Sequence, residues 1–264
     1  MRWDPGQYQR YGDERSRPFV ELLDRIDVAR GVNATDPSYV VDLGCGPGNL
    51  TRSLSHRWPT AETLGVDSST DMVAAAREHA IEGRLEFAVG DLAVWQAARP
   101  VDVLVANAAL HWVPHHVDLI AGFADTLAPG GVFAFQVPDN FTEPSHTLLR
   151  DLRRSPRWRD RIGADADRGA GVERPETYLR ALVDAGLAPD VWQSEYLHVL
   201  VGANAVLEWV KGTALRPVLS LLTDDAERDE FLESYAAQLR TAYPEQDFGT
   251  VFPFRRTFAV GRKS

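Results

Sequence analysis

Cysteine and long apolar runs are what this chain of 264 residues has least of. Its single cysteine excludes an internal disulfide, which is typical of proteins from a reducing compartment. No apolar run approaches the ~18 residues of a membrane span, and the first residues lack the basic-then-apolar order of a secretory signal. We therefore expect a soluble, cytoplasmic protein with no membrane partner.

Positive charge is also scarce, because 28 Lys and Arg face 38 Asp and Glu and the formal net charge is −10. Binding to nucleic acid requires clustered Lys and Arg, so this balance argues against a nucleic-acid partner. An acidic small molecule is not excluded, but it would need a local basic pocket. The hydrophobic content of 44% is enough for a large core in one domain with insertions, and it leaves the oligomeric state open.

The histidines follow no metal-ligand spacing. His115 and His116 are adjacent in an expected loop, and no cysteine or clustered carboxylate accompanies them. We therefore expect no metal ion.

A glycine-rich loop after an apolar run carries the strongest local signal. The run 39–43 predicts a buried strand, alternate glycines from Gly44 to Gly48 predict a tight turn, and a helix is expected near 49–57. Glycine leaves bare main chain against which a ligand can lie, and the N–H groups at a helix start suit a carboxylate. A dinucleotide fingerprint needs G-x-G-x-x-G, whereas this loop is G-x-G-x-G after the acidic Asp42. This form resembles the first motif of class I S-adenosylmethionine (SAM)-dependent methyltransferases.

The first half of the chain alternates short β patterns with helical ones, which predicts a parallel sheet with helices on both faces. The Pro-Gly-Gly run at 129–131 predicts a turn before the fifth strand. We expect strands near 39–43, 62–67, 85–89, 101–106 and 131–137, and helices near 17–29, 49–57, 69–80 and 116–127.

The second half departs from this alternation. Phe231, Tyr235, Leu239 and Tyr243 repeat every four residues, which predicts the apolar stripe of a packed helix. A last strand after a helical excursion fits the antiparallel seventh strand of a class I methyltransferase sheet. We expect a polar insertion at 138–174 with a helix near 144–155, a helix near 175–185, a strand near 189–200, a helical block at about 203–243 and a last strand at 250–260.

These patterns predict an α/β fold: a Rossmann-like, seven-stranded class I methyltransferase sheet with an antiparallel seventh strand and helical insertions. No repeat, low-complexity tract or inter-domain linker interrupts the sequence. We expect one domain over 1–264, with an N-terminal lid at about 1–30 and substrate-side helical insertions at about 138–174 and 203–247.

The expected cofactor site has four parts in the order that a SAM site of this fold requires. After the glycine loop, Asp67 ends the second strand, where its carboxylate can accept both ribose hydroxyls. Asp91 follows the third strand and can accept from an adenine amino group, while Leu92 packs on the ring. The run 107–112 follows the fourth strand and would lie beneath the sulfonium. In open α/β sheets ligands bind beyond the carboxyl ends of the strands, where all four parts are expected.

Each part alone has a structural alternative, because glycines can form a plain turn and aspartates can cap helices. Their order along the chain favours SAM over a nicotinamide cofactor. Tyr8 and Arg17 precede or begin the opening helix and suggest a lid over the cofactor, the alternative being a segment that only packs on the sheet. The expected cofactor residues are Tyr8, Arg17, Asp42, Gly44, Gly46, Asn49, Asp67, Ser68, Met72, Asp91, Leu92, Asn107, Ala108 and Trp112.

Segments that match one family of proteins run along nearly the whole chain. They are 3–5, 15–18, 42–49, 65–69, 107–114, 136–140, 144–146, 208–217 and 252–256. The glycine motif is shared by many methyltransferases, whereas the later segments are more specific. Together they resemble the trans-aconitate 2-methyltransferase family.

This resemblance implies transfer of a methyl group from SAM to one carboxylate of trans-aconitate, which gives a monomethyl ester and S-adenosylhomocysteine (SAH). A carboxylate with a pKa near ~4 is ionised at pH 7, so the nucleophile needs no general base and we expect no catalytic residue. The two other carboxylates would be held by basic and hydrogen-bonding groups, with Arg giving bidentate geometry. Arg255 and Arg256 are adjacent on a strand and point to opposite faces, so only one reaches a given pocket. The expected substrate residues are His146, Tyr196, Lys211, Arg216, Arg255 and Arg256.

Four alternatives stay open. Another small carboxylic acid or a carrier-bound acyl carboxylate would use the same chemistry, although a carrier protein would need a concentrated basic docking face. A quinone or amine methyltransferase would need an apolar pocket or a base. A nicotinamide oxidoreductase would need the third glycine one residue later, and a non-catalytic SAM-binding module would bind the cofactor without turnover.

Overall fold

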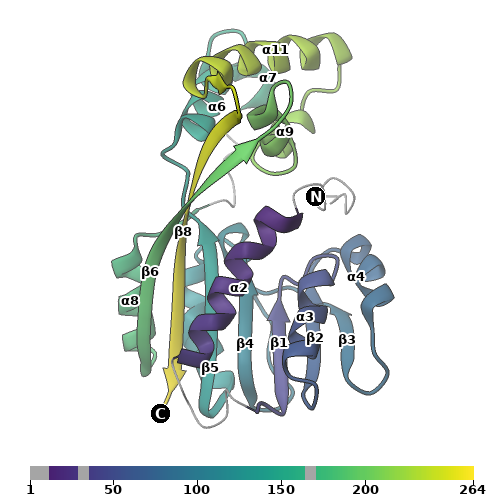
Figure 1. Cartoon of the computed structure of the whole chain (residues 1–264), viewed down its shortest axis with the longest axis vertical. Helices are drawn as coiled ribbons and strands as arrows, with labels where there is room; N and C mark the ends of the chain where they lie inside the picture. The colour runs from purple at the N-terminus through teal and green to yellow at the C-terminus, as the bar shows by residue number, and fades with distance from the viewer. Residues whose placement is uncertain (1–11, 29–35, 164–170) are drawn as a thin grey trace. The chain divides into compact units, whose positions relative to one another are not determined.

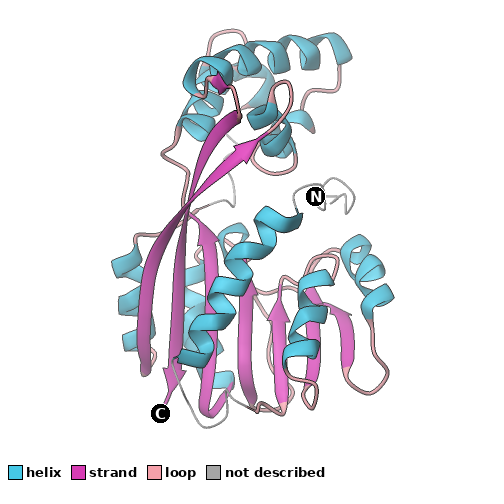
Figure 2. Ribbon diagram, viewed as in Figure 1, coloured by secondary structure: helices cyan, strands magenta, loops and turns pink. Residues whose placement is uncertain are grey.

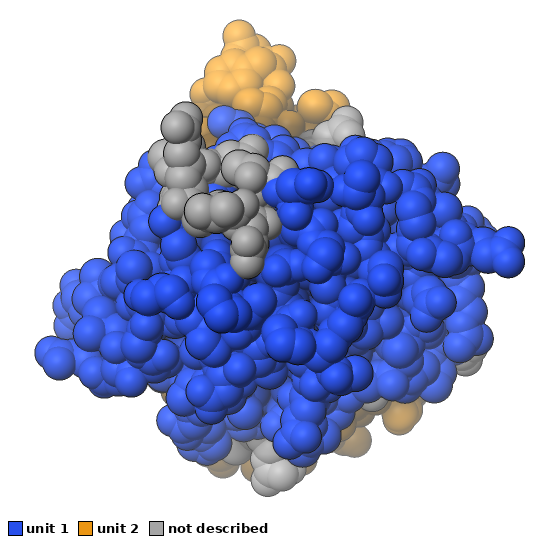
Figure 3. Space-filling view, turned by 90° about the horizontal axis from the view of Figure 1, so that it is seen from below, with its two compact units in different colours: residues 1–137, 169–194, 256–264 blue, residues 138–168, 195–255 orange. Residues whose placement is uncertain are grey.

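The computed structural model describes residues 12–28, 36–163 and 171–264. The chain divides into two compact units, unit 1 with residues 1–137, 169–194 and 256–264 and unit 2 with residues 138–168 and 195–255 (Figure 3). Unit 2 covers most of the two insertions that the sequence predicts. The expectation that the whole chain is one domain stays a prediction.

A sheet with the strand order β3-β2-β1-β4-β5-β8-β6 lies mostly in unit 1, and β6 and β8 each continue into unit 2. Its strands are β1 (Tyr39–Leu43), β2 (Glu62–Asp67), β3 (Leu85–Val89), β4 (Val101–Asn107), β5 (Leu127–Pro138), β6 (Leu187–Leu200) and β8 (Gly249–Lys263). β1 pairs in parallel with β2 and β4, β2 with β3, and β4 with β5. β8 lies between β5 and β6 and runs opposite to β1 (Figure 1). The predicted seven-stranded sheet with an antiparallel last strand is confirmed, and a two-residue strand, β7 (Glu245–Gln246), also pairs with β8.

Helices flank this sheet, and α2 and α3 cross in front of it in Figure 2. The α-helices of unit 1 are α2 (Gly12–Val28), α3 (Asn49–Arg57), α4 (Thr70–Ala76), α5 (Leu119–Thr126) and α8 (Pro175–Asp184). Short 3-10 helices cover η1 (Arg77–His79), η2 (Leu110–Trp112) and η3 (His116–Asp118). The helix predicted over 69–80 is therefore split into α4 and η1.

The core of unit 1 surrounds β4 and β5. β1 is buried at all five positions and β4 at all but its last, as expected for parallel strands that are covered on both faces. Phe133 and Phe135 of β5 lie 5.1 Å apart between ring centroids, and Phe135 meets Tyr178 of α8 edge-on at 5.3 Å. This rigid centre fixes the carboxyl ends of the strands, where a ligand is expected.

Helix α2 is held to the far edge of the sheet by one carboxylate and one indole. Glu21 accepts a hydrogen bond from Trp192 Nε1 at 3.0 Å and another from the hydroxyl of Ser194. Trp192 stacks on Phe258 at 4.9 Å between ring centroids, and the Arg25 guanidinium lies over the same indole. Helix α2 is thus attached to β6.

The turn predicted at 129–131 is wrong, because these residues lie inside β5. Leu127 already pairs with Val101 of β4, and a register shift between Val101 and Val103 accommodates the irregularity. Gly130 takes a φ of 76°, which lets the strand bulge without ending.

Unit 2 contains α6 (Pro144–Arg154), α7 (Arg159–Ile162), α9 (Ala205–Lys211), α10 (Arg216–Leu219) and α11 (Asp225–Ala242). The block predicted at 203–243 is therefore three helices, because Asp224 caps a new helix by accepting from the Glu227 N–H at 2.9 Å. The predicted apolar stripe is confirmed, since Phe231, Tyr235, Leu239 and Tyr243 are all buried.

Two segments that are distant in sequence meet inside unit 2. The Ser145 N–H at the start of α6 donates to the Tyr243 hydroxyl at 3.0 Å, and the Tyr235 hydroxyl donates to the Ser145 carbonyl. Trp158 packs edge-on against Phe231 at 5.2 Å between ring centroids. These contacts give unit 2 a core of its own.

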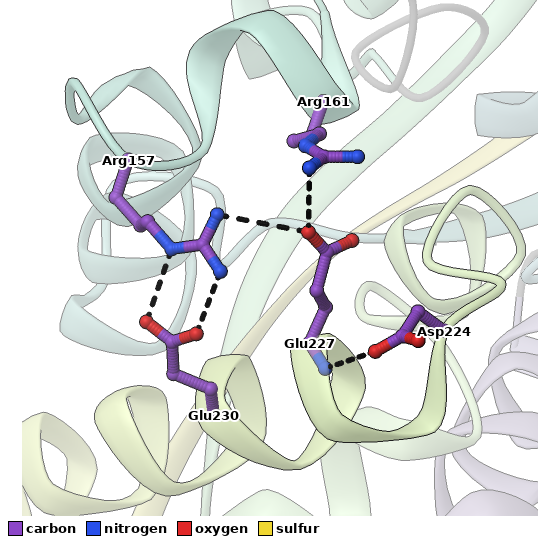
Figure 4. Close-up of polar contacts among 5 residues, drawn as sticks. All are labelled: Arg157, Arg161, Asp224, Glu227 and Glu230. Carbon is purple, nitrogen blue, oxygen red and sulfur yellow. Dashed lines mark hydrogen bonds and ion pairs between the residues drawn. The ribbon is translucent and has the colours of Figure 1, made fainter.

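Ion pairs link Arg157 and Arg161, which lie just before and within α7, to α11 on the surface of unit 2 (Figure 4). Arg157 donates to both carboxylate oxygens of Glu230, from Nε at 3.1 Å and from Nη2 at 2.8 Å. Glu227 lies 2.9 Å from Arg161 and 3.7 Å from Arg157. Pairs this exposed each add little stability alone, so their effect is to fix the short α7 against α11.

Candidate functional site

The candidate site lies in unit 1, beyond the carboxyl ends of β1 and β4. A cavity there is lined by Asp42, Gly44, Cys45, Gly46, Pro47, Asn49, Leu50 and Asn107. Five of the residues expected to contact a cofactor therefore share one cavity. Cys45, Pro47 and Leu50 were not foreseen as lining residues, and their only sequence signal is their place inside the loop.

The three glycines of the loop have different reasons to be glycine. All take positive φ angles, 78° at Gly44, 55° at Gly46 and 83° at Gly48. A Cβ on Gly44 would lie 2.2 Å from the Cβ of Ala109, and one on Gly48 would lie 2.8 Å from that of Ala76. A Cβ on Gly46 would meet nothing within 4 Å. Gly44 and Gly48 are thus required by packing, whereas Gly46 leaves bare main chain facing open space.

Asp42 is a buried carboxylate with one oxygen in use. It is 2% exposed, and its Oδ2 accepts a hydrogen bond from the Thr51 hydroxyl at 2.7 Å. Its Oδ1 is buried and has no hydrogen-bond partner among the residues that the structure describes. Burial raises the pKa of Asp42 to about 7, opposed by the Thr51 hydrogen bond and aided by the negative charge of Asp67. A cationic donor in the cavity would satisfy this oxygen and hold the group ionised.

Asp67 is fixed at the end of β2 by two backbone N–H groups. Its Oδ2 accepts from Gly46 at 2.9 Å and its Oδ1 from Ser69 at 2.8 Å. Burial raises its pKa, and these two hydrogen bonds oppose the shift. Each carboxylate oxygen can accept a second hydrogen bond, so both remain able to bind a pair of hydroxyls.

The other residues expected near the cofactor occupy varied positions in unit 1. Asp91 is exposed and accepts from the Ala93 N–H at 2.9 Å, while Leu92 is buried in the core. Met72 is buried on α4, and Ser68 is exposed. Arg17 is exposed on α2 and Trp112 is half-buried on η2, whereas Tyr8 lies outside the described residues. Their contacts with a cofactor stay predictions.

Asn107 belongs to a hydrogen-bonded row of side chains. Gln136 Nε2 donates to Asn107 Oδ1 at 2.7 Å, and Gln136 Oε1 accepts from Arg256 Nη1 at 3.1 Å. The next residue, Ala108, takes a φ of 51°, and its N–H donates to the Gln136 carbonyl at 3.0 Å. Gln136 lies within β5, in register with Asn107, and the sequence alone does not reveal that it connects Arg256 with Asn107.

The other expected substrate residues lie in unit 2. Arg255 has a one-third exposed side chain, with Asp139 and Thr142 each 3.5 Å away. Lys211 donates to Glu208 at 2.6 Å. Burial, aided by the positive charge of Arg150, lowers the pKa of His146 to about 4, so this ring is neutral at pH 7. Tyr196 is buried and stacks on His198, and Arg216 is half-buried at the start of α10.

Two features are absent from the part of the chain that the structure describes. No group of three His, Cys, Asp or Glu side chains is placed to hold a metal ion there. No helix in these residues is long and apolar enough to cross a bilayer. The polar side chains that line the cavity are those of Asp42, Asn49 and Asn107.

Comparisons with solved structures agree with the fold. The chain is similar to the YcgJ protein from Bacillus subtilis, with a TM-score of 0.55 and 16% identity over 93% of this chain and 98% of that one. It is also similar to a geranyl diphosphate C-methyltransferase from Streptomyces coelicolor, solved with S-adenosyl-L-homocysteine, with a TM-score of 0.53 and 16% identity over 94% of this chain and 76% of that one. At this level of identity the likeness concerns the fold alone.

Comparisons of sequence are more specific. A family model described as a methyltransferase domain matches residues 40–131. A trans-aconitate 2-methyltransferase of Streptomyces avermitilis is 49% identical over 99% of this chain and 97% of its own length. One from Streptomyces coelicolor is 50% identical over 99% of this chain and 86% of its own length, and one from Mycobacterium tuberculosis is 44% identical over 98% and 95%. The chain therefore belongs to the trans-aconitate 2-methyltransferase family.

Proposed function

We propose that this enzyme transfers a methyl group from SAM to a carboxylate of trans-aconitate, giving a monomethyl ester and SAH. The observation that carries the proposal is the similarity to trans-aconitate 2-methyltransferases, which spans 99% of the chain at 49% identity. The cavity of the glycine loop supports it, because its groups suit an amino acid joined to a nucleoside. We also propose that the reaction takes place in the cytoplasm, for which the support is the free thiol of Cys45.

The residues around the cavity fit SAM. Gly46 leaves space where any Cβ would stand, and the second oxygen of Asp42 is a buried acceptor that suits the cofactor's ammonium group. Asp67 is held by two N–H groups with capacity left for a ribose diol. When bound, SAM supplies an electrophilic methyl group on a sulfonium. Asp42, Gly46 and Asp67 would hold the donor in one orientation.

The protein's own contribution to the reaction is alignment. The attacking carboxylate is ionised at neutral pH, so the enzyme need not remove a proton. Negative oxygen and positive sulfonium neutralise one another in the transition state, so no large developing charge has to be stabilised. Holding two reactants in line contributes up to about 7–11 kcal/mol in favourable cases. We accordingly assign no general base.

Arg255 is our first choice among the basic residues for holding a non-reacting carboxylate. Its contacts with Asp139 and Thr142 are long, at 3.5 Å, so its guanidinium is able to exchange them for a ligand. Arg255→Lys removes bidentate geometry and should raise the KM for the acid by about tenfold or more. SAH affinity should not change. The matched control is Arg240→Lys, since Arg240 donates to Asn204 and Glu233. It should change neither the KM for the acid nor the affinity for SAH.

The decisive experiment offers the enzyme SAM together with a panel of di- and tricarboxylic acids. SAH and methyl ester are followed by mass spectrometry, and SAH binding is measured separately by calorimetry. An ester that forms with trans-aconitate, and weakly or not at all with citrate, supports the proposal. SAH binding without turnover of any acid would keep the cofactor and overturn the substrate. Faster turnover of another acid would move the assignment to that acid.

A further inference from the structure

Three polar side chains on neighbouring strands form a hydrogen-bonded row in unit 1. Arg256 Nη1 donates to Gln136 Oε1 at 3.1 Å, and Gln136 Nε2 donates to Asn107 Oδ1 at 2.7 Å. Asn107 and Gln136 are register partners on β4 and β5, and β8, which carries Arg256, lies beside β5. Gln136 is 0% and Arg256 5% exposed, so water cannot readily replace these bonds.

Chemistry fixes the direction of this row. A guanidinium carries donors only, so Gln136 has to turn its Oε1 toward Arg256. Its Nε2 then faces Asn107, which has to turn Oδ1 toward it. A flipped Asn107 would set donor against donor at a partly buried position, which disfavours that form by about tenfold or more. Arg256 thus decides which end of the Asn107 amide faces away from Gln136.

The end that faces away is the amide nitrogen of Asn107. It has no hydrogen-bond partner within the described parts of the chain, and Asn107 lines the cavity of the glycine loop. The backbone beside it is also fixed, because the Ala108 N–H donates to the Gln136 carbonyl at 3.0 Å. The cavity therefore has a donor of fixed orientation at Asn107 and a buried acceptor at Asp42.

We propose that Arg256 is a positioning residue that acts through Gln136 to hold the Asn107 amide as a donor to the carboxylate of the cofactor's amino-acid end. That end carries one cationic and one anionic group, which match the acceptor on Asp42 and the donor on Asn107. The inference deepens the proposed function, because it names groups that hold the cofactor. It does not depend on which acid is methylated, and it gives Arg256 a role other than contact with the substrate.

Calorimetry with two probes tests the proposal without turnover. SAH carries the amino-acid end, whereas 5′-methylthioadenosine lacks it. Asn107→Ala should weaken SAH binding by about tenfold or more and leave methylthioadenosine binding unchanged, since a hydrogen bond to a charged group is lost. Arg256→Gln can present either end of its amide to Gln136, so it should weaken SAH binding and leave methylthioadenosine binding unchanged. Arg256→Lys keeps a donor toward Gln136 and should retain most of the wild-type affinity for SAH.

A double-mutant cycle separates positioning from a structural role. Gln136→Glu keeps a partner for Arg256 but offers Asn107 an acceptor, which turns the Asn107 donor away from the cavity and should weaken SAH binding. In the Asn107→Ala background the same change should have less than about a twofold effect, because coupled residues are not additive.

Three results would overturn the proposal: unchanged SAH affinity in Asn107→Ala, additive losses in the cycle, or equal losses for both probes. If Arg256→Gln does not fold, the Gln136→Glu cycle tests the same link with Arg256 intact. Normal SAH binding without methylation of any acid would count against the proposed function and leave this inference standing.

Discussion

Replacing Asp42 by asparagine should stabilise the ligand-free protein above neutral pH. Burial raises the pKa of Asp42 from 3.8 to about 7, against the Thr51 hydrogen bond and with help from Asp67. The unfolded chain keeps the ordinary pKa. Between the two values the native state therefore binds a proton that the unfolded state does not, so the free energy of unfolding falls as pH rises. Asparagine does not titrate and escapes this loss.

The magnitude follows from the width of this window. Stability changes by about 1.4 kcal/mol per pH unit between the two pKa values, which amounts to about 3 kcal/mol from pH 5 to pH 7. The additional N–H of asparagine, left without a partner beside Thr51, costs about 1–3 kcal/mol at every pH and cancels in a comparison of two pH values. For a chain of this size, about 3 kcal/mol corresponds to roughly 6–12 °C in Tm.

Thermal melts of the ligand-free protein at pH 5 and pH 8 and constant ionic strength provide the assay. The Tm of Asp42→Asn relative to wild type should rise by roughly 6–12 °C between the two conditions. Asp229→Asn removes an exposed carboxylate of α11 and should show no such change. An equal Tm difference at both pH values would refute the reasoning, because it would mean that burial does not perturb Asp42. The variant should also bind SAH more weakly, since it loses the acceptor for the ammonium group.

Four further substitutions test the packing and the site. Gly44→Ala places a Cβ 2.2 Å from that of Ala109 and should lower the free energy of unfolding by about 3 kcal/mol or more in urea titrations; a wild-type midpoint would contradict the clash. Gly46→Ala meets no atom within 4 Å, so it should cost only about 1–2 kcal/mol for its positive φ, yet calorimetry should show much weaker SAH binding. Lys263→Ala removes an ammonium that donates to three carbonyls at the end of α5 and should cost about 1–3 kcal/mol, with faster amide exchange in that helix. Tyr178→Phe removes a hydroxyl that bonds His116 at 2.8 Å and should cost about 1–2 kcal/mol; an unchanged midpoint would show that water replaces it.

Much of unit 1 could be predicted from local sequence. β1, β2, β3 and α3 have the expected bounds, because apolar runs end at glycine, proline or aspartate residues that restrict the backbone. The helix expected near 17–29 begins earlier, at Gly12, because Pro18 is tolerated inside α2. The Pro-Gly-Gly run at 129–131 predicts a turn that does not form, because pairing with β4 continues β5 through these residues.

The residues of the site could be predicted from the sequence, but the hydrogen bonds and packing contacts between them could not. The order of Asp42, the loop glycines, Asp67 and Asn107 indicated a cofactor site, and Asp42, Gly44, Gly46 and Asn107 line one cavity. The link from Asn107 through Gln136 to Arg256 was not predictable, because it joins three strands that only the register of the sheet brings together. Likewise, only packing shows that Gly44 is required by Ala109.

The place of β8 has a consequence for synthesis of the chain. β8 follows both β5 and β6 in the sequence, yet it lies between them in the sheet. Translation from the end of β5 at Pro138 to the start of β8 at Gly249 takes several seconds at ~5–20 residues per second. During that time β5 keeps an open edge of unpaired N–H and C=O groups, and β6 adds another once Leu187–Leu200 have been made. Such edges can pair between nascent chains. A copy that stops at residue 248 should therefore sediment after in vitro translation, whereas the full-length product should stay in the supernatant. That result would mean that the 15 residues of β8 protect the newly made chain from aggregation.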